Sequence, residues 1–405
     1  MQIITKPRIL ILIHYLEIGG AEISLIGLLN AIDKSKYDVD LFIYSHQGEL
    51  MQLIPEGVNL LPEIPKYSTL ERSMKEVLRE GHVDIVVARL LAKIRHRIYR
   101  RTHKITGEDA SIFQYVANCT TPLLPKISDI EYDLAISFVM PHNICLKKVK
   151  AKKRIAWIHT DYSIVNINKD IELPIWSQFD YISSISDATT TAYLSVFPEL
   201  EHKIVKIENI LAPNFVRQRA DINLPVYNIN DLQRSNTITL LTIGRFCRQK
   251  NYDNLPFICK HLVDMGVDVR WYIIGFGSNE PLIRAKIAEA GVEERVIILG
   301  KRSNPYPYIK ACDIYVQPSR YEGKSVTVRE AQMLYKPVVV TNYPTAPSQI
   351  EDGVDGVIVP MDNRGCAEGI KVLIDNKELQ NRIIEHLHTH DYGNESEVEK
   401  IYKLI

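Results

Sequence analysis

Two glutamates flank a stretch of this 405-residue sequence that suits a phosphate ligand. Glu322 and Glu330 stand on either side of a short polar turn, 323–325, and of the first residues of a helical pattern, 326–334. A helix N-terminus offers unpaired N–H groups and a partial positive charge, and both favour phosphate. A carboxylate on each side can accept hydrogen bonds from hydroxyl groups. The arrangement therefore predicts a site for a sugar, a diphosphate and a ribose, which are the parts of a nucleotide-sugar.

The elements that position these side chains can be read from the same stretch. Asp313 to Val316 has the composition of a buried strand, and Gly323 allows a tight turn after it. Ser325 is a good N-cap for the helix, and Pro337 ends that helix. The sequence thus predicts that the phosphate lies against the turn and the first helical residues, which are Gly323, Lys324, Ser325 and Val326.

A second candidate phosphate contact follows the apolar run 239–243. There a loop that begins with Gly244 carries Arg245 and Lys250, placed so that their positive charge can neutralise a leaving diphosphate. A further strand, 270–274, ends in Gly275-Phe276-Gly277, and Glu280 stands where a dinucleotide-binding fingerprint needs its third glycine. That glutamate argues against NAD. A strand over 296–299 and a helix over 306–311 complete this part of the pattern.

The N-terminal half shows a similar order of strand, glycine turn and helix. Residues 9–13 form a continuous apolar run, and Gly19-Gly20 opens a helix through Asn30. The Gly-Gly turn suits either a ligand close to the backbone or plain packing of helix on strand. Further strands are expected at the following ranges: 39–44, 84–88, 133–138, 154–158 and 181–186. Asp38-Val39-Asp40, at the entry of one strand, is interpreted as strand-edge chemistry rather than as a metal site.

One histidine stands at the end of a predicted strand. His159 follows Arg154 to Ile158 and precedes an acid two residues later. At the carboxyl edge of an open α/β sheet such a side chain points into the ligand crevice. The alternative is a structural histidine, and the functional interpretation is favoured here.

Bulk composition limits the classes of function. Lys plus Arg and Asp plus Glu are both 49, so no global field favours nucleic acid. The six cysteines are scattered and lack zinc spacing, which fits a cytoplasmic protein. No apolar run approaches the roughly 18 residues of a membrane span, and the N-terminal apolar run is read as a strand rather than as a signal peptide.

The stretch 90–105, LLAKIRHRIYRRTHKI, is a basic amphipathic helix without an acid. Contact with an anionic membrane surface is one interpretation, and an ordinary domain helix with a solvated basic face is the other. A second basic run, 147–154, adds to the first interpretation. No aromatic nucleic-acid-binding motif accompanies the charge.

The segment S-x-Y-E-G-x-x-x-x-x-x-E-A, residues 319–331, resembles the signature of retaining glycosyltransferases of family 4, of the type that builds bacterial surface polysaccharides. The Gly-Arg loop with Lys250-Asn251, the Trp-Ile-His-x-Asp segment around His159, Ser186-Asp187 and Asn209 also match this family. This chain departs from the family pattern directly after Glu-Gly, where it has Lys324-Ser325-Val326. The resemblance covers nearly the whole chain and is strongest over 240–360.

The resemblance implies the GT-B fold, an α/β architecture of two Rossmann-like domains facing across a cleft. It implies an N-terminal acceptor domain at 1–212, a connection at 213–236, a nucleotide-sugar domain at 237–378, and C-terminal helices, 379–405, that pack back on the first domain. In the family, Glu322 would hold the donor sugar, Glu330 the ribose, and Arg245 with Lys250 the diphosphate, while His159 would lie near the reaction centre. Donor contacts would also come from the following residues: Gly19, Gly20, Gly244, Gly275, Arg302, Gly323, Lys324, Ser325 and Val326.

The expected activity is transfer of a sugar with retention, from a nucleotide diphosphate sugar, most commonly a UDP-sugar, to a glycan or lipid-linked glycan. No metal and no cofactor are expected. The expected location is cytoplasmic, with peripheral contact at the inner face of the plasma membrane. The alternatives are a nucleotide-sugar 2-epimerase of the same fold and a non-catalytic nucleotide-sugar-binding protein.

Overall fold

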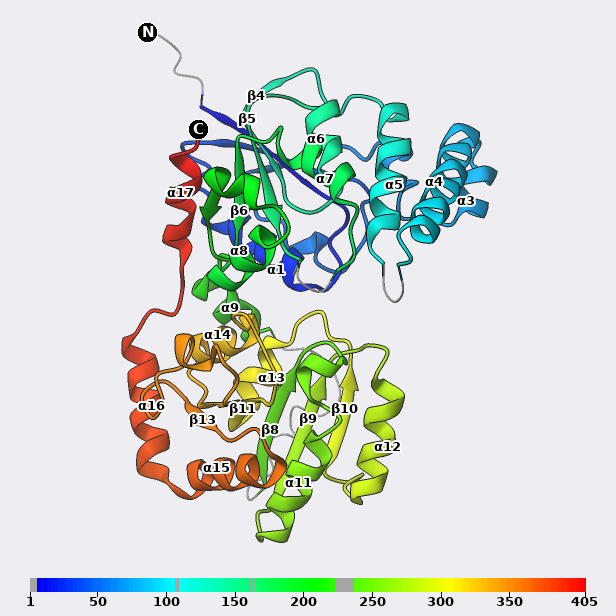
Figure 1. The fold of residues 1–405 in the computed structure, drawn as a ribbon. Coiled ribbons are helices and arrows are strands. Elements are labelled where there is room, and N and C mark those ends of the chain that lie inside the picture. Colours follow the sequence, from blue (N-terminus) through cyan, green and yellow to red (C-terminus); the bar gives the residue numbers. More distant parts are fainter. Residues whose placement is uncertain (1–5, 106–108, 161, 163–164, 223–236) are drawn as a thin grey trace. The chain divides into compact units, whose positions relative to one another are not determined.

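The computed structural model describes residues 6–105, 109–160, 162, 165–222 and 237–405. The chain divides into two compact units, shown as ribbons in Figure 1. The first unit comprises residues 1–210 and 394–405, and the second comprises 211–393. Each unit is described by itself below.

Most of the apolar runs of the N-terminal half form one parallel sheet in the first unit. The strand order is β3-β2-β1-β4-β5-β6-β7, so neighbours lie on both sides of the first strand. Ile11 of β1 lies opposite Leu41 of β2 and Ile136 of β4. The strands are β1 (Arg8–Ile13), β2 (Asp38–Ile43), β3 (Val58–Leu60), β4 (Glu131–Ser137), β5 (Lys150–Ile158), β6 (Tyr181–Ser184) and β7 (Ile204–Lys206).

Helices connect these parallel strands, because a parallel pair needs a crossover. One face of the sheet, with Leu10 and Leu12, packs in a core with the aromatic rings of Tyr67, Trp176 and Tyr193. The helices of this unit are α1 (Gly20–Ala31), α2 (Pro65–Ser68), α3 (Met74–Arg79), α4 (Val83–Thr102), α5 (Ser111–Thr120), α6 (Asn143–Lys148), α7 (Lys169–Trp176), α8 (Asp187–Leu194) and α17 (Val398–Tyr402), with 3-10 turns at 51–53, 121–123, 198–203 and 395–397.

The second unit repeats the pattern around a six-stranded parallel sheet of order β10-β9-β8-β11-β12-β13. Successive side chains of a strand point to opposite faces, and the two faces here form two cores. Leu240 packs with α11, α12, α15 and α16, and Leu241 packs with α9, α13 and α14. The strands are β8 (Ile238–Ile243), β9 (Val269–Ile274), β10 (Val296–Gly300), β11 (Ile314–Gln317), β12 (Val338–Thr341) and β13 (Val357–Val359).

Two helices of the second unit, α13 and α14, match the predicted helices over 306–311 and 326–334 to within a residue. The helices of this unit are α9 (Pro213–Ala220), α11 (Leu255–Asp264), α12 (Glu280–Ala290), α13 (Tyr306–Ala311), α14 (Val326–Met333), α15 (Asn363–Asp375) and α16 (Lys377–Thr389), with 3-10 turns at 248–250 and 346–348.

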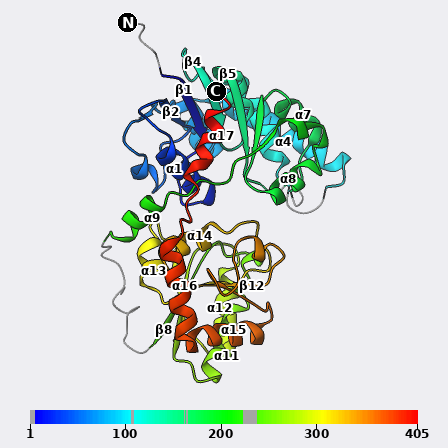
Figure 2. The same cartoon turned by 90° about the vertical axis from the view of Figure 1, so that its left-hand side faces the viewer.

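The unit boundaries differ from the predicted domain limits. The predicted connection, 213–236, begins with helix α9, which packs in the second unit, and its residues 223–236 lie outside the described part of the chain. Helix α16 also belongs to the second unit, through Ile383 and Leu387. Only residues 394–405 of the predicted C-terminal segment rejoin the first unit, where α17 lies (Figure 2).

One sequence interpretation in the first unit was wrong. Residues 84–88, predicted as a strand, lie in the first two turns of helix α4, because a short apolar run fits a strand and a helix equally well. The basic run 147–154 spans the end of α6 and the start of β5, and two of its lysines pair with acids across the sheet: Lys152 with Asp133 and Lys153 with Asp180.

Candidate active site

The second sheet brings the candidate residues of the C-terminal half to one edge. Strand β8 has β9 on one side and β11 on the other. After β8 the chain adds β9 and β10 on one side of it, and then returns to add β11, β12 and β13 on the other side. Ligands of open α/β sheets bind at this switch point, outside the carboxyl ends of the strands. Gly244 follows β8, and Gln317 ends β11. The cationic loop and the two glutamates thus come from adjacent strand ends.

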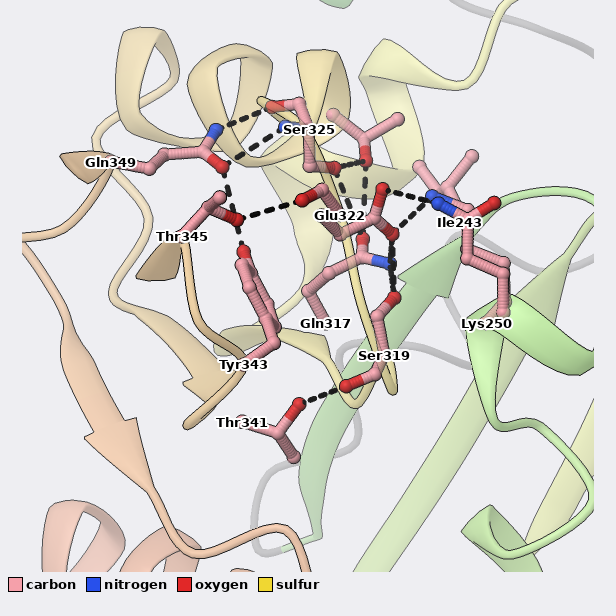
Figure 3. A network of polar contacts seen from close by, with 12 residues as sticks. Ile243, Lys250, Gln317, Ser319, Glu322, Ser325, Thr341, Tyr343, Thr345 and Gln349 are labelled. Atoms are coloured by element: carbon pink, nitrogen blue, oxygen red, sulfur yellow. Dashed lines mark hydrogen bonds and ion pairs between the residues drawn. The ribbon is translucent and has the colours of Figure 1, made fainter. Parts of the chain in front are cut away.

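Glu322 is the centre of a polar network at this edge (Figure 3). Its Oε1 accepts hydrogen bonds from Lys250 Nζ at 2.6 Å and from Ser319 Oγ at 2.6 Å. Its Oε2 accepts one from Gln249 Nε2 at 3.1 Å. The Glu322 side chain is 6% exposed and that of Lys250 is 15% exposed. This carboxylate and this ammonium group are therefore nearly removed from bulk water and held in fixed positions.

Polar side chains of β11, of β12 and of the loop after β12 hold the backbone and side chains of this network in place. Gln317 Nε2 donates to Ser319 Oγ at 2.7 Å, and Thr341 Oγ1 donates to the Ser319 carbonyl at 2.5 Å. Thr345 Oγ1 donates to the carbonyl of Glu322 itself at 2.7 Å. Gln317, Thr341 and Thr345 had no sequence signal, because their role depends on which strands become neighbours in the sheet.

Helix α14 begins beside this network, and Ser325 occupies its N-cap position as predicted. The Ser325 side chain makes no cap hydrogen bond, and its hydroxyl lies 3.1 Å from Thr327 Oγ1. Gln349 instead holds its backbone on both sides: Gln349 Oε1 accepts from the Ser325 N–H at 3.0 Å, and Gln349 Nε2 donates to the Ser325 carbonyl at 2.6 Å. A phosphate at this helix would therefore meet the next N–H groups, from Val326 onward, or displace Gln349.

Gly323 lies at a bend between β11 and α14. Its φ is not positive, and a Cβ built there would meet no atom within 4 Å. The open space lies beside exposed Lys324, and it leaves the turn accessible to a ligand. Glycine here is thus explained by access to the backbone rather than by backbone conformation.

Gly275 and Gly244 are required by close contact between two loops. A Cβ at Gly275 would lie 1.9 Å from the carbonyl oxygen of Gly244, which is inside any possible contact distance. A Cβ at Gly244 would lie 2.7 Å from Tyr252 Oη and 3.1 Å from Lys250 Cε. These glycines let the β8 and β9 loops approach and hold Lys250 in place.

Substituting Gly275 and Gly323 by alanine is expected to give opposite results. Gly275→Ala forces the two loops apart, and we expect a destabilisation of about 1–3 kcal/mol or more, seen as a lower thermal midpoint. Gly323→Ala meets no atom, so its thermal midpoint should equal that of the unchanged protein, while the affinity for a bound nucleotide-sugar should fall. Equal thermal midpoints for the two variants would contradict this account of the loops.

Glu330 lies deeper than its predicted ribose contact implied. The residue is 3% exposed, and its Oε1 accepts a hydrogen bond from Tyr306 Oη at 2.8 Å. Burial raises the pKa of the Glu330 carboxyl to about 7. Tyr306 also lies next to Arg219 of α9, whose Nε is buried without a hydrogen-bond partner among the residues that the structure describes. Sequence reasoning missed both Tyr306 and Arg219 as neighbours of Glu330.

The other cations stand apart from the Glu322 network. Arg245 is exposed, and the structure gives it no hydrogen bond to that network within the described residues. Arg302 is half-buried, with its Nε 3.2 Å from Tyr308 Oη and its Nη1 donating to the Lys301 carbonyl at 3.0 Å. Of the predicted cations, the structure thus places Lys250 in contact with Glu322.

The remaining candidates, His159, Gly19 and Gly20, belong to the first unit. His159 follows β5, as predicted, and packs with Phe138 at a centroid distance of 4.7 Å. Burial lowers the pKa of its imidazole to about 3, so the ring is neutral at pH 7. Its Nε2 is buried and has no hydrogen-bond partner in the described part of the chain. The ring is thus a neutral group with one unused polar atom.

At the Gly-Gly turn, Gly20 begins α1 and Gly19 precedes it. The Glu22 side chain folds back over Gly19, where a Cβ would lie 2.1 Å from Glu22 Oε2. Two further histidines follow β1 and β4, at the switch point of this sheet. His14 Nδ1 lies 2.8 Å from Glu71 Oε1, and His142 Nδ1 lies 2.8 Å from Ser137 Oγ. Sequence reasoning had not selected Glu22 or these histidines.

The Asp-x-Asp sequence at 38–40 belongs to the sheet, as expected. Asp40 is buried and accepts hydrogen bonds from Asn59 Nδ2 at 2.7 Å and from Tyr132 Oη at 2.8 Å. Across the described residues, no group of three or more His, Cys, Asp or Glu side chains is arranged to hold a metal ion.

Comparison with known families and proteins was made with this geometry in hand. Residues 229–388 match the family model of glycosyl transferases group 1. The chain is 28% identical over 150 residues to alpha-D-kanosaminyltransferase of Streptomyces kanamyceticus, a match that covers 36% of this chain and 39% of that protein. It is 23% identical over 333 residues to N-acetyl-alpha-D-glucosaminyl L-malate synthase of Bacillus anthracis, covering 77% and 84%.

A third relative is a Campylobacter jejuni enzyme named N-acetylgalactosamine-N,N'-diacetylbacillosaminyl-diphospho-undecaprenol 4-alpha-N-acetylgalactosaminyltransferase. The identity is 27% over 143 residues, covering 35% of this chain and 38% of that protein. The matched region thus spans less than two-fifths of the length of this relative and of the Streptomyces one.

Solved structures extend the likeness to the whole chain. HepE of Anabaena in complex with UDP and glucose aligns with a TM-score of 0.66 at 16% identity, covering 98% of each chain. TarM of Staphylococcus aureus in complex with fondaparinux, alpha-GlcNAc-glycerol and UDP aligns with a TM-score of 0.65 at 15% identity, covering 98% of this chain and 99% of that chain. The predicted α/β fold of the GT-B type is confirmed for the two units, and residues 229–388 are similar to the glycosyl transferases group 1 family.

Proposed function

We propose that this protein is a retaining glycosyltransferase that moves a sugar from a nucleotide diphosphate sugar, with UDP as the nucleotide, to a glycan or lipid-linked glycan. The observation that carries the proposal is the buried Lys250–Glu322 pair at the switch point of the second sheet, beside the start of α14. Bound UDP in the aligned HepE and TarM structures supports the nucleotide. The names of the relatives support sugar transfer, and one of them specifies a polyprenyl diphosphate acceptor.

The chemistry requires stabilisation of a departing diphosphate. As the bond between the anomeric carbon and the diphosphate oxygen breaks, negative charge grows on the phosphate oxygens. Lys250, Arg245 and the first free N–H groups of α14 can stabilise that charge. Because Lys250 is 15% exposed and held by Glu322, its charge acts with little screening and little reorganisation.

The two glutamates would position the donor. Glu322 is proposed to accept hydrogen bonds from the donor sugar through the oxygen that Gln249 now contacts, while Lys250 turns toward the diphosphate. Glu330 is proposed to hold the ribose, with Tyr306 orienting its carboxylate. His159, neutral at pH 7, is proposed to contact the donor sugar with its unused Nε2.

The anomeric configuration would be retained, without a metal, if the acceptor oxygen attacks the anomeric carbon on the same face from which the diphosphate leaves. The acceptor oxygen forms its bond to the anomeric carbon as the bond to the diphosphate breaks, and the departing phosphate takes the acceptor's proton. No cofactor is needed for this balance. We place the reaction at the cytoplasmic face of the membrane, where a lipid-linked acceptor would be presented.

Release of nucleoside diphosphate tests the proposal. Purified protein is incubated with a panel of nucleotide-sugars and EDTA, with and without a membrane glycolipid extract. We expect release from one donor, an increase with the extract, no effect of EDTA, and loss of release in Glu330→Ala. Inversion of the free donor at C2 without transfer would instead indicate the epimerase, and binding without turnover would indicate a non-catalytic binding protein.

A further inference from the structure

Helix α4 presents an apolar stripe to solvent rather than to the core. Its members recur at intervals of three and four residues, which places them along one side of the helix. Each is between 46% and 58% exposed: Val83, Val87, Leu90, Leu91, Ile94 and Ile98. The neighbouring helices α3 and α5 expose two more large apolar side chains, Leu78 at 52% and Phe113 at 68%. Soluble surfaces rarely expose so many large apolar side chains together, so the stripe indicates a binding surface.

The orientation of α4 is fixed by its opposite side. Ile85, Ala88 and Ala92 are buried there, and α4 packs against α3 and α5, as Figure 1 shows. Arg89 Nη1 donates to the carbonyls of Thr69 at 3.1 Å and Arg72 at 2.7 Å. The helix therefore cannot turn its stripe inward without breaking buried contacts.

Positive charge borders this stripe. Residues 93–105, in the C-terminal half of α4 and just beyond it, carry six cations and no acid: Lys93, Arg95, Arg97, Arg100, Arg101 and Lys104. Within the described residues, Asp109 lies 3.5 Å from Arg100 and 2.8 Å from His96, so it pairs with one of these six cations. An open hollow of about 440 Å³ at this end is lined by His96, Arg97, Arg100, Arg101 and Ile105. Its lining suits an anionic headgroup.

We propose that α4 docks the first unit onto an anionic lipid bilayer, with the stripe in the headgroup–acyl boundary and the cations on the phosphates. An exposed apolar face bordered by Lys and Arg is what such a surface binds. A second copy of the chain is a poorer occupant, because it would bring the same cations against each other. In the part of the chain that the structure describes, no helix is long and apolar enough to cross a membrane.

The proposed function explains why docking would be useful, since it would bring the enzyme to a membrane-borne acceptor, and the proposal rests on that function in this respect alone. The binding itself needs no turnover. Docking is therefore tested without any donor or acceptor, and its failure is distinguishable from failure of the transferase assignment.

Sedimentation with vesicles tests docking. The full chain is mixed with phosphatidylcholine vesicles or with vesicles that also contain phosphatidylglycerol, at low and high salt. We expect binding to the anionic vesicles only, weakened by salt. The double variants Ile94→Asp/Ile98→Asp and Arg97→Glu/Arg101→Glu should each bind roughly tenfold or more weakly. Val372→Asp is the matched control, since Val372 is 60% exposed on α15 of the second unit, and it should bind as the unchanged protein does.

Several results would overturn the proposal. Equal binding to neutral and anionic vesicles, or unchanged binding by both double variants, would remove the role of the stripe and its charge. A dimer in light scattering that Ile94→Asp/Ile98→Asp dissociates would show that the stripe joins two copies instead. Circular dichroism and nucleotide binding by the double variants confirm that a loss of vesicle binding is not a loss of folding.

Discussion

Lys250→Met is expected to lower kcat/KM for the nucleotide-sugar roughly 10²- to 10³-fold, the cost of removing one preorganised group that stabilises transition-state charge. The physical reason is its position: the ammonium group is almost buried and held 2.6 Å from Glu322 Oε1. If the charge acts mainly on the departing diphosphate, kcat falls and the donor KM changes little. Steady-state release of nucleoside diphosphate measures both constants.

The same substitution should also destabilise the second unit, because it leaves the Glu322 carboxylate buried without its cation. Breaking a buried pair by removing one partner costs about 3–5 kcal/mol. Adding Glu322→Gln should restore much of the lost thermal stability but none of the activity. Lys260→Met is the matched control: Lys260 pairs with Asp264 at the surface of α11, where its side chain is 45% exposed, and such pairs contribute about 0–1 kcal/mol. A control as destabilised as Lys250→Met would contradict the argument from burial.

Glu330 is expected to make the protein less stable as the pH rises. The folded state raises the pKa of this carboxyl from 4.5 to about 7, so between these values the folded state keeps a proton that the unfolded state has lost. Its contribution is present in full below pH 4.5 and is lost as the pH passes 7, with a change on the order of 3 kcal/mol. Thermal midpoints at pH 5 and pH 8 should therefore differ less in Glu330→Gln than in the unchanged protein.

Glu172 provides the control for this prediction. It lies in the first unit with Trp176 Nε1 donating to its Oε2 at 2.6 Å, and burial raises its pKa to about 7 as well. Glu172→Gln should flatten the pH dependence similarly and leave donor affinity unchanged. Glu330→Gln should flatten it and also weaken donor binding by about 1.5–3 kcal/mol, the value of a hydrogen bond to a charged group. Equal donor affinity in the two variants would remove Glu330 from the ribose site.

Buried parallel strands were the most predictable part of the fold. Residues 9–13 and 239–243 are continuous apolar runs, and they form the first strands of the two sheets. The run at 84–88 gave the wrong result because its apolar residues belong to a helix with two apolar sides, one buried and one exposed. Sequence periodicity shows that one side of a helix is apolar. Whether that side is buried, and against which element, depends on the tertiary fold.

The candidate site was predictable where side chains follow strand ends and unpredictable where they meet across the fold. Lys250 and Glu322 were chosen separately, and the structure joins them directly. Gln349 was missed because it reaches Ser325 from a turn 24 residues away. Tyr306 was missed because a buried tyrosine is ordinarily a core residue, and only the packing of α13 on α14 brings its hydroxyl to Glu330.

The path of the chain between the units has a consequence for synthesis. The first unit includes residues 394–405, and Tyr402 stacks on Tyr37 at 4.3 Å while its hydroxyl accepts a hydrogen bond from the Asp33 N–H at 2.8 Å. On a ribosome, residues 1–210 emerge first but cannot acquire these contacts until the second unit has been made. The second unit is continuous in sequence, so it can complete its folding earlier than the unit that precedes it.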